Sequence, residues 1–269
     1  MQNMRNEQKY RLRFGLILIC VMVLFAVVSF FYTPYDPYAM NPAQRFQAPS
    51  FAHVFGTDHF GRDNFSRAVT GTRYSLFAAG ATILLSGSIG ITIGLFVGYT
   101  GGAAETIVMR FVDALASFPG VLMALVTVTV CGGGKYTIIP ALAVAFLPSF
   151  IRIARSGAQQ CRRRDYIEAA HVCGISMWRI LFRHILPNLL SSVIPAVVIG
   201  LSNAILAESG MSYLGLGIQP PAPSWGRMLA EGQAYLMRAP WESLSAGLMI
   251  FLAVLGFHTL GDGISETAR

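Results

Sequence analysis

The chain has 269 residues, of which 54% are apolar and 12% are charged, with a formal net charge of +7 and a mean hydropathy of +0.55. An average soluble domain carries about 25% charged residues, so this composition predicts an integral membrane protein whose apolar surface faces lipid. The same numbers exclude a disordered chain, and four cysteines without a CxxC pair exclude a disulfide scaffold. The basic residues cluster beside long apolar runs, which favours membrane loops over nucleic-acid binding.

Crossing about 30 Å of hydrocarbon takes about 20 residues, and six charge-free apolar runs are candidates for such spans. The first follows a basic tail and has no small-residue cleavage site after it, which favours a retained helix over a secretory signal. The fourth run is short and contains two prolines, so we expect it to continue past Arg152. The predicted spans are residues 14–33, 75–100, 114–134, 136–151, 185–207 and 243–261.

Six spans place both termini on the same side of the membrane. With the amino terminus inside, 13 of the 20 lysines and arginines lie on the inner side and seven on the outer side. This distribution follows the positive-inside rule, although the first outer loop alone carries four arginines. We therefore predict that both termini are cytoplasmic.

Small residues recur at every fourth position of the second span. A row of small side chains lets a neighbouring helix approach closely, and close packing is a main source of helix association in lipid. The row therefore predicts a helix-packing face rather than a substrate site. Its members are Ala78, Thr82, Ser86, Gly90, Gly94 and Gly98.

Two acidic residues lie near the ends of spans. Asp113 follows Arg110 at i, i+3 spacing, which predicts a local ion pair. Glu208 has two alternatives, a place along a path through the membrane or an interfacial or capping role. The spans contain no row of acids of the kind that proton-coupled pumps use.

Motifs of catalysis and nucleotide binding are absent from the sequence. None of the five histidines forms HExxH, and no GxSxG elbow occurs. The run Gly-Gly-Gly-Lys at 132–135 resembles a phosphate loop only superficially, because Tyr136 stands where Ser or Thr is required. We therefore predict no catalytic residue, no metal ligand and no ATP site in this chain, and a turn at glycines 132–134.

The longest predicted inner loop, about residues 157–188, contains two short helices. Asp165 is expected to cap the first helix, and Gly174 suits its left-handed end. Ala169 and Ala170 keep one surface slim, so that a partner could enclose the helix in a groove. The alternative from the residues alone is an interfacial amphipathic helix whose arginines contact phospholipid head groups.

This loop resembles the EAA loop of bacterial ABC importer permeases. The resemblance rests on a Glu-Ala-Ala triplet, a glycine after three further residues, and an Ile-Leu-Pro ending at 185–187, with His184 as a mild departure. In that family the loop is the coupling helix that sits in a cleft of the ATP-binding subunit. The residues that the resemblance assigns to ATPase coupling are Glu168, Ala169, Ala170 and Gly174.

Two further segments resemble the dipeptide, oligopeptide and nickel branch of that family. Residues 56–67 resemble its GTDxxGRDxxSR segment, and residues 212–226 resemble its second outer loop. From the residues alone, the two aspartates of the first segment can pair with its arginines, and Trp225 and Trp241 suit the membrane interface. The residues of this outer motif are Gly56, Thr57, Asp58, Gly61, Arg62, Asp63, Ser66 and Arg67.

The resemblance implies a type I ABC importer permease, an all-α integral membrane protein with six spans and a cytoplasmic coupling helix. Residues 1–73 would form an N-terminal anchor and outer segment, and residues 74–269 the permease core. The implied partners are a homologous second permease, two ATP-binding subunits that hold ATP and Mg²⁺, and an extracytoplasmic solute-binding protein, all at a bacterial cytoplasmic membrane. The expected cargo is short peptides, with nickel or a metal–chelator complex as the alternative. A self-sufficient secondary transporter is a more distant alternative, and no enzymatic activity is expected.

Overall fold

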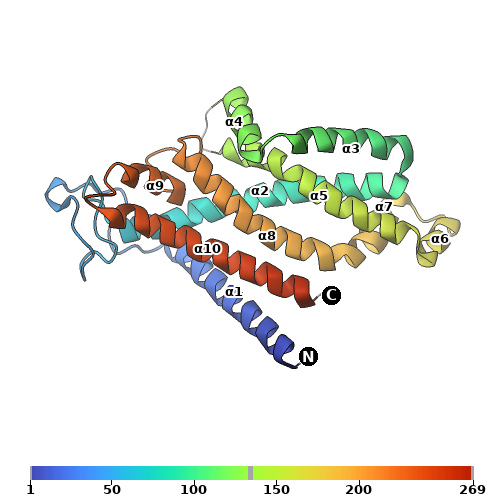
Figure 1. Ribbon diagram of the computed structural model, residues 1–269, viewed down its shortest axis with the longest axis horizontal. Helices are drawn as coiled ribbons and strands as arrows, with labels where there is room; N and C mark the ends of the chain where they lie inside the picture. Colours follow the sequence, from blue (N-terminus) through green and yellow to red (C-terminus); the bar gives the residue numbers. More distant parts are fainter. Residues whose placement is uncertain (1, 133–135, 268–269) are drawn as a thin grey trace.

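The computed structural model describes residues 2–132 and 136–267, which are helical apart from loops and one isolated β-bridge between Thr57 and Asp63. The long helices run along the long axis of the molecule (Figure 1). The elements are α1 (Gln2–Val28), the 3₁₀ turn η1 (Pro42–Gln44), α2 (Asn64–Thr100), α3 (Gly102–Ser117), α4 (Gly120–Cys131), α5 (Ile138–Arg162), α6 (Asp165–Val172), α7 (Met177–Arg179), the π-helical turn η2 (Ile180–Ile185), α8 (Leu186–Tyr213), α9 (Trp225–Gln233) and α10 (Pro240–Thr267).

Five stretches of helix are long and apolar enough to cross a membrane, and α3 and α4 make a sixth span if the bent pair is counted as one. The five stretches belong to α1, α2, α5, α10 and the continuous run from α7 to α8. The predicted all-α fold with six spans is therefore confirmed. The predicted continuation of the fourth span is also confirmed, because α5 includes Pro148 and ends only at Arg162.

The third span differs from the prediction, which placed one continuous helix at 114–134. The chain instead forms α3 and α4, which are bent by 95° relative to each other. The break lies at Phe118, whose ψ of 137° is extended, because the proline that follows disfavours the helical region. The predicted turn at 132–134 lies largely outside the described residues, although Gly132 has a φ of +80°.

Asp113 lies on α3 and pairs with Arg152 of α5 at 2.8 Å. The predicted local pair with Arg110 is therefore wrong, because the neighbouring helix α5 places the Arg152 guanidinium within reach of the Asp113 carboxylate. The α3 helix also begins earlier than predicted, at Gly102, because its charged residues Glu105 and Asp113 pair with arginines of α5.

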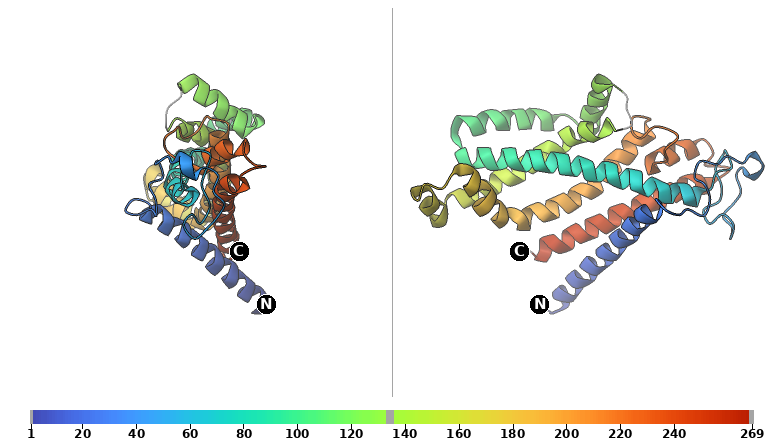
Figure 2. Two further views of the ribbon diagram at one scale, coloured as in Figure 1. Left: turned by 90° about the vertical axis from the view of Figure 1, so that its left-hand side faces the viewer. Right: turned by 180° about the vertical axis from the view of Figure 1, so that it is seen from behind.

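The core of the bundle forms where α2 lies beside α5 and α8, as the right view of Figure 2 shows. Ile83 of α2, Phe150 of α5 and Ile205 of α8 belong to one buried cluster. α2 runs without interruption from Asn64, so the predicted boundary between residues 73 and 74 falls inside this helix. The outer segment is thus continuous with the central helix of the core.

Trp225 belongs to the same core, contrary to the interfacial position predicted for it. Its side chain is completely buried, and its indole Nε1 donates to the carbonyl of Ala68 at 3.0 Å. Trp241 is half-buried and donates to the carbonyl of Thr57 at 3.1 Å. Both tryptophans satisfy their N–H group inside the protein, which removes the reason to place them in the head-group layer.

The two ends of the bundle are different in character. Residues 34–63 form an irregular segment at one end, next to α9 and the beginning of α10 (Figure 1). The α6 segment extends from the opposite end, and both termini point toward that end. The segments singled out by sequence motifs therefore lie at opposite ends of the long helices.

Candidate functional site

The α6 segment is a short helix that extends beyond the long spans. Asp165 and Glu168 lie in its first turn, where the positive end of the helix dipole stabilises negatively charged carboxylates. Arg164 is the N-cap residue and no side chain caps the helix, so the predicted capping role of Asp165 is wrong. Gly174 ends the helix with a φ of +73°, as predicted, and its N–H donates to the carbonyl of His171 at 3.0 Å.

The two faces of α6 have different environments. Ile167 and Ala170 are buried and pack in a cluster with the π-helical turn η2 and with α5. Glu168 and Ala169 are exposed on the other face. Ala169 is therefore the alanine of the pair that offers a slim contact surface, whereas Ala170 anchors the helix to its own chain. The exposed face is held rigidly, since its opposite face is part of the core.

Glu168 also lines a cavity of about 410 Å³ between α6 and the end of α2. The other lining residues are Tyr99, Thr100, Arg162, Ile167 and His171. This cavity places Glu168 near the end of α2.

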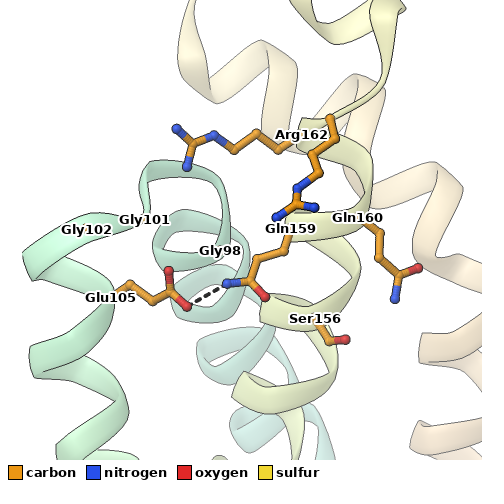
Figure 3. Close-up of a pocket in the computed structure, with 9 residues that line it drawn as sticks. Gly98, Gly101, Gly102, Glu105, Ser156, Gln159, Gln160 and Arg162 are labelled. Atoms are coloured by element: carbon orange, nitrogen blue, oxygen red, sulfur yellow. Dashed lines mark hydrogen bonds between the residues drawn. The ribbon is translucent and has the colours of Figure 1, made fainter.

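A second, polar cavity of about 600 Å³ lies at the same end, between the α2–α3 turn and the end of α5 (Figure 3). Glu105 of α3 points across it toward Gln159, whose Nε2 donates to Glu105 Oε1 at 2.6 Å. Arg155 Nε donates to the same oxygen at 2.5 Å. Sequence reasoning missed this link, because a single glutamate fifty residues from its partner leaves no local pattern.

The three glycines of the small-residue row of α2 face α5. A Cβ atom added to Gly90 would lie 2.7 Å from Phe150 Cβ, and one added to Gly94 would lie 2.8 Å from Ala154 Cβ. One added to Gly98 would lie 2.5 Å from the carbonyl oxygen of Arg155. Real Cβ contacts are essentially never this short, so α2 and α5 approach each other at a distance that only glycine permits.

The residues of the outer motif form a compact, buried network of hydrogen bonds and ion pairs at the other end of the bundle. Asp63 caps α2, accepting from the N–H of Ser66 at 2.7 Å, and also binds His53 Nδ1 at 2.9 Å. Asp58 binds Arg62 Nε at 2.5 Å, as one of the two pairs suggested by the sequence. Gly56 and Gly61 have φ values of +64° and +77°, which glycine adopts without strain.

The motif's arginines reach a carboxylate that sequence reasoning missed. Glu231 of α9 accepts from Arg62 Nη2 at 2.9 Å and from Arg67 Nη2 at 2.8 Å, and it pairs with Arg227 at 3.1 Å. Arg67 is only 2% exposed, and its buried charge is balanced by Glu231 and by Asp58, whose Oδ2 lies 3.7 Å from its Nε. This network therefore joins the outer segment to α9. Thr57 completes it through a hydroxyl that donates to the carbonyl of Gln44.

Glu208 of α8 is completely buried near the core. Its Oε1 accepts from Ser212 Oγ at 2.6 Å, and the same Oγ accepts from the N–H of Ile218 at 3.3 Å. Glu208 is thus linked through Ser212 to the loop that follows α8.

Comparisons with known proteins agree with this architecture. Residues 90–266 match the family of the binding-protein-dependent transport system inner membrane component. The chain is 38% identical to the glutathione transport system permease protein GsiD of Pectobacterium atrosepticum, with 93% of this chain and 83% of that protein covered. It is also 38% identical to the dipeptide transport system permease protein DppC of Alkalihalophilus pseudofirmus, with 94% and 83% covered.

Among solved structures, the chain resembles inward-facing conformations of the MetNI methionine ABC transporter. The TM-score is 0.60 at 19% identity, with 76% of this chain and 96% of that chain covered, which is a likeness of fold. The family match and the curated relatives together cover nearly the whole chain. The chain therefore belongs to the family of binding-protein-dependent transport system inner membrane components, and it is a multi-pass membrane permease of the ABC importer type.

Proposed function

We propose that this chain is one of two permease subunits of an ATP-driven importer of di- and oligopeptides in the bacterial cytoplasmic membrane. The peptide cargo is supported by the dipeptide and glutathione permeases among the relatives. The coupling role is carried by one observation, the α6 helix, which presents Glu168 and Ala169 outward while Ile167 and Ala170 anchor it to the core. The chain would supply half of the path and one mechanical link.

The proposed assembly contains a homologous permease, two ATP-binding subunits that hold ATP and Mg²⁺, and an extracytoplasmic solute-binding protein. ATP binding would draw the two ATP-binding subunits together and pull the α6 helices with them. Because α6 packs on η2 and α5, this movement would tilt the long spans between inward-open and outward-open states. Import follows if the binding protein and ATP favour one state and the released cargo the other.

Reconstitution tests the assignment directly. Proteoliposomes with the chain, its partner permease and the ATP-binding subunits are expected to accumulate labelled dipeptide only when ATP and the solute-binding protein are present. Uptake by the chain alone, driven by an ion gradient and indifferent to ATP, would instead establish a secondary transporter.

Glu168→Lys is expected to lower ATP-dependent uptake by more than 10-fold, since reversing a charge in an interface of this kind costs about 2–5 kcal/mol. The variant should retain its fold, because the Glu168 side chain is exposed and outside the core. The measurement is peptide uptake together with ATP hydrolysis in the same proteoliposomes. Glu168→Gln, which keeps the size, separates charge from shape, and wild-type uptake by the lysine variant would contradict the coupling role.

The orientation is tested by cysteine labelling. In a background without native cysteines, Gln160→Cys at the polar cavity is expected to react with a membrane-impermeant maleimide only from the cytoplasmic side. Met237→Cys, at a fully exposed position near the opposite end, is the matched control and should react only from outside. The reverse pattern would invert the proposed topology.

A further inference from the structure

His59 and Glu242 form a buried pair where the outer segment meets the beginning of α10. The His59 Nδ1 and Glu242 Oε1 atoms are 2.7 Å apart, and the side chains are 12% and 3% exposed. The two residues are 183 positions apart in the chain. Figures 1 and 2 show the two elements meeting at the end of the bundle opposite α6. This contact therefore joins the outer segment to the last span.

The second carboxylate oxygen of Glu242 is buried, and among the described residues it accepts no hydrogen bond. A buried carboxylate oxygen without a partner is costly, because it has lost its water and gained nothing in exchange. Glu242 Oε2 is thus free to bind a cation, and the His59 imidazole lies beside the same carboxylate.

Asp58 brings a third ligand atom to the same place. One such atom from each of Asp58, His59 and Glu242 lies within 4.8 Å of the others, the one group of this kind within residues 2–132 and 136–267. Asp58 Oδ1 accepts from the N–H groups of Phe60 and Arg62, and Oδ2 accepts from Arg62 Nε. The Nε atom of Arg67 also lies 3.7 Å from Oδ2, which is too long for a hydrogen bond, so Oδ2 keeps one of its two acceptor positions.

The charged groups around the site balance one another. Four carboxylates lie here with three guanidinium groups, and Arg238, 4.2 Å from the centroid of the Phe46 ring, supplies a fourth. The case for a cation therefore rests on the unpartnered oxygen of Glu242. His53 is occupied by Asp63, so His59 is the imidazole available beside Glu242. The carboxylates are those of Asp58, Asp63, Glu231 and Glu242, and the guanidinium groups are those of Arg62, Arg67 and Arg227.

We propose that Asp58, His59 and Glu242 bind a divalent transition-metal ion of the zinc class, which clips the outer segment to α10. One imidazole nitrogen with two carboxylate oxygens is a ligand set that Zn²⁺ and its neighbours accept. The His59 ring is oriented by stacking on Tyr235 at a centroid distance of 4.9 Å. Binding moves the ring proton of His59 from Nδ1 to Nε2, so that the imidazole stays neutral while Nδ1 becomes a ligand, and it gives the unpartnered Glu242 oxygen a ligand role.

The test is a metal titration of the purified permease complex after treatment with a chelator. Zn²⁺ is titrated against a chromophoric competitor, and the bound zinc is counted by mass spectrometry. Wild-type protein is expected to bind one more zinc per chain than the His59→Phe variant, whose ring can keep the stacking on Tyr235. The affinity of this site should fall at least about 100-fold in the variant, because even outer partners of metal sites contribute 10–100-fold.

Glu242→Gln provides an independent variant, since the amide oxygen can still accept the hydrogen bond from His59 but is a poor metal ligand. Both variants should lose the zinc-dependent rise in melting temperature that the wild type shows. His258→Phe, on the exposed side of α10, is the matched control and should keep both. Equal zinc stoichiometry and affinity in wild type and both variants, or no zinc bound by the wild type, would overturn the proposal.

Discussion

The Gly94→Leu variant is expected to yield no correctly folded permease. A Cβ at Gly94 would already lie 2.8 Å from Ala154 Cβ and closer still to the carbonyl oxygen of Ile151. The leucine side chain therefore has to push α2 and α5 apart along the contact that organises the core. Overpacking by a few methylene groups costs about 1–3 kcal/mol, and a whole side chain between two helix backbones should cost about 3 kcal/mol or more.

The measurement is the yield of monodisperse protein in detergent and its melting temperature. Gly80→Leu is the matched control, because Gly80 lies on the same helix and a Cβ there meets nothing within 4 Å. Helix propensity changes equally in both variants, so a difference between them isolates packing. Equal stability of the two variants would show that α2 and α5 do not need this close approach.

The second large effect is expected from Glu231→Leu. This substitution removes the carboxylate shared by Arg62 and Arg67, whose side chains are 8% and 2% exposed. Removing one partner of a buried ion pair costs about 3–5 kcal/mol, and here Arg62 and Arg67 would have to share the Asp58 carboxylate. The outer segment should therefore detach from α9 and become sensitive to protease before the spans unfold.

Limited proteolysis of the purified protein, followed by mass spectrometry of the cut sites, measures this effect. Arg227→Leu is the control, since Arg227 binds the same carboxylate but is 31% exposed. An exposed pair contributes about 0–1 kcal/mol, so this variant should resist protease like the wild type. Comparable cleavage of the two variants would mean that the ion pairs of Glu231 with Arg62 and Arg67 do not hold the outer segment on α9.

The spans were predictable from the sequence because the bilayer imposes a local rule. About twenty consecutive apolar residues are needed at 1.5 Å each, and this requirement can be read from neighbouring residues alone. The left-handed end of α6 at Gly174 was predictable for the same reason, since the φ of +73° is a property of one residue. The row at Gly90, Gly94 and Gly98 identified a packing face, although it did not identify α5 as the neighbour.

Long-range contacts escaped prediction because they have no local signature. Trp225 has the composition of an interfacial residue, and only the carbonyl of Ala68, 157 positions away, explains its burial. Asp113 pairs with Arg152 of α5 and not with Arg110 of its own helical turn. The sequence around Glu105 likewise does not indicate that Arg155 and Gln159 donate hydrogen bonds to its carboxylate.

The sequence by itself determined that this chain is a helical membrane permease, that a short helix with a Glu-Ala-Ala triplet lies in its longest inner loop, and where most of its spans lie. These features depend on hydropathy, charge placement and short motifs, each of which acts over fewer than about thirty residues. Only the tertiary structure decided which face of α6 is outward, that α3 and α4 are bent apart, and that His59 and Glu242 meet. Those features depend on contacts between distant segments, whose partners are chosen by packing and by charge compensation in the folded bundle.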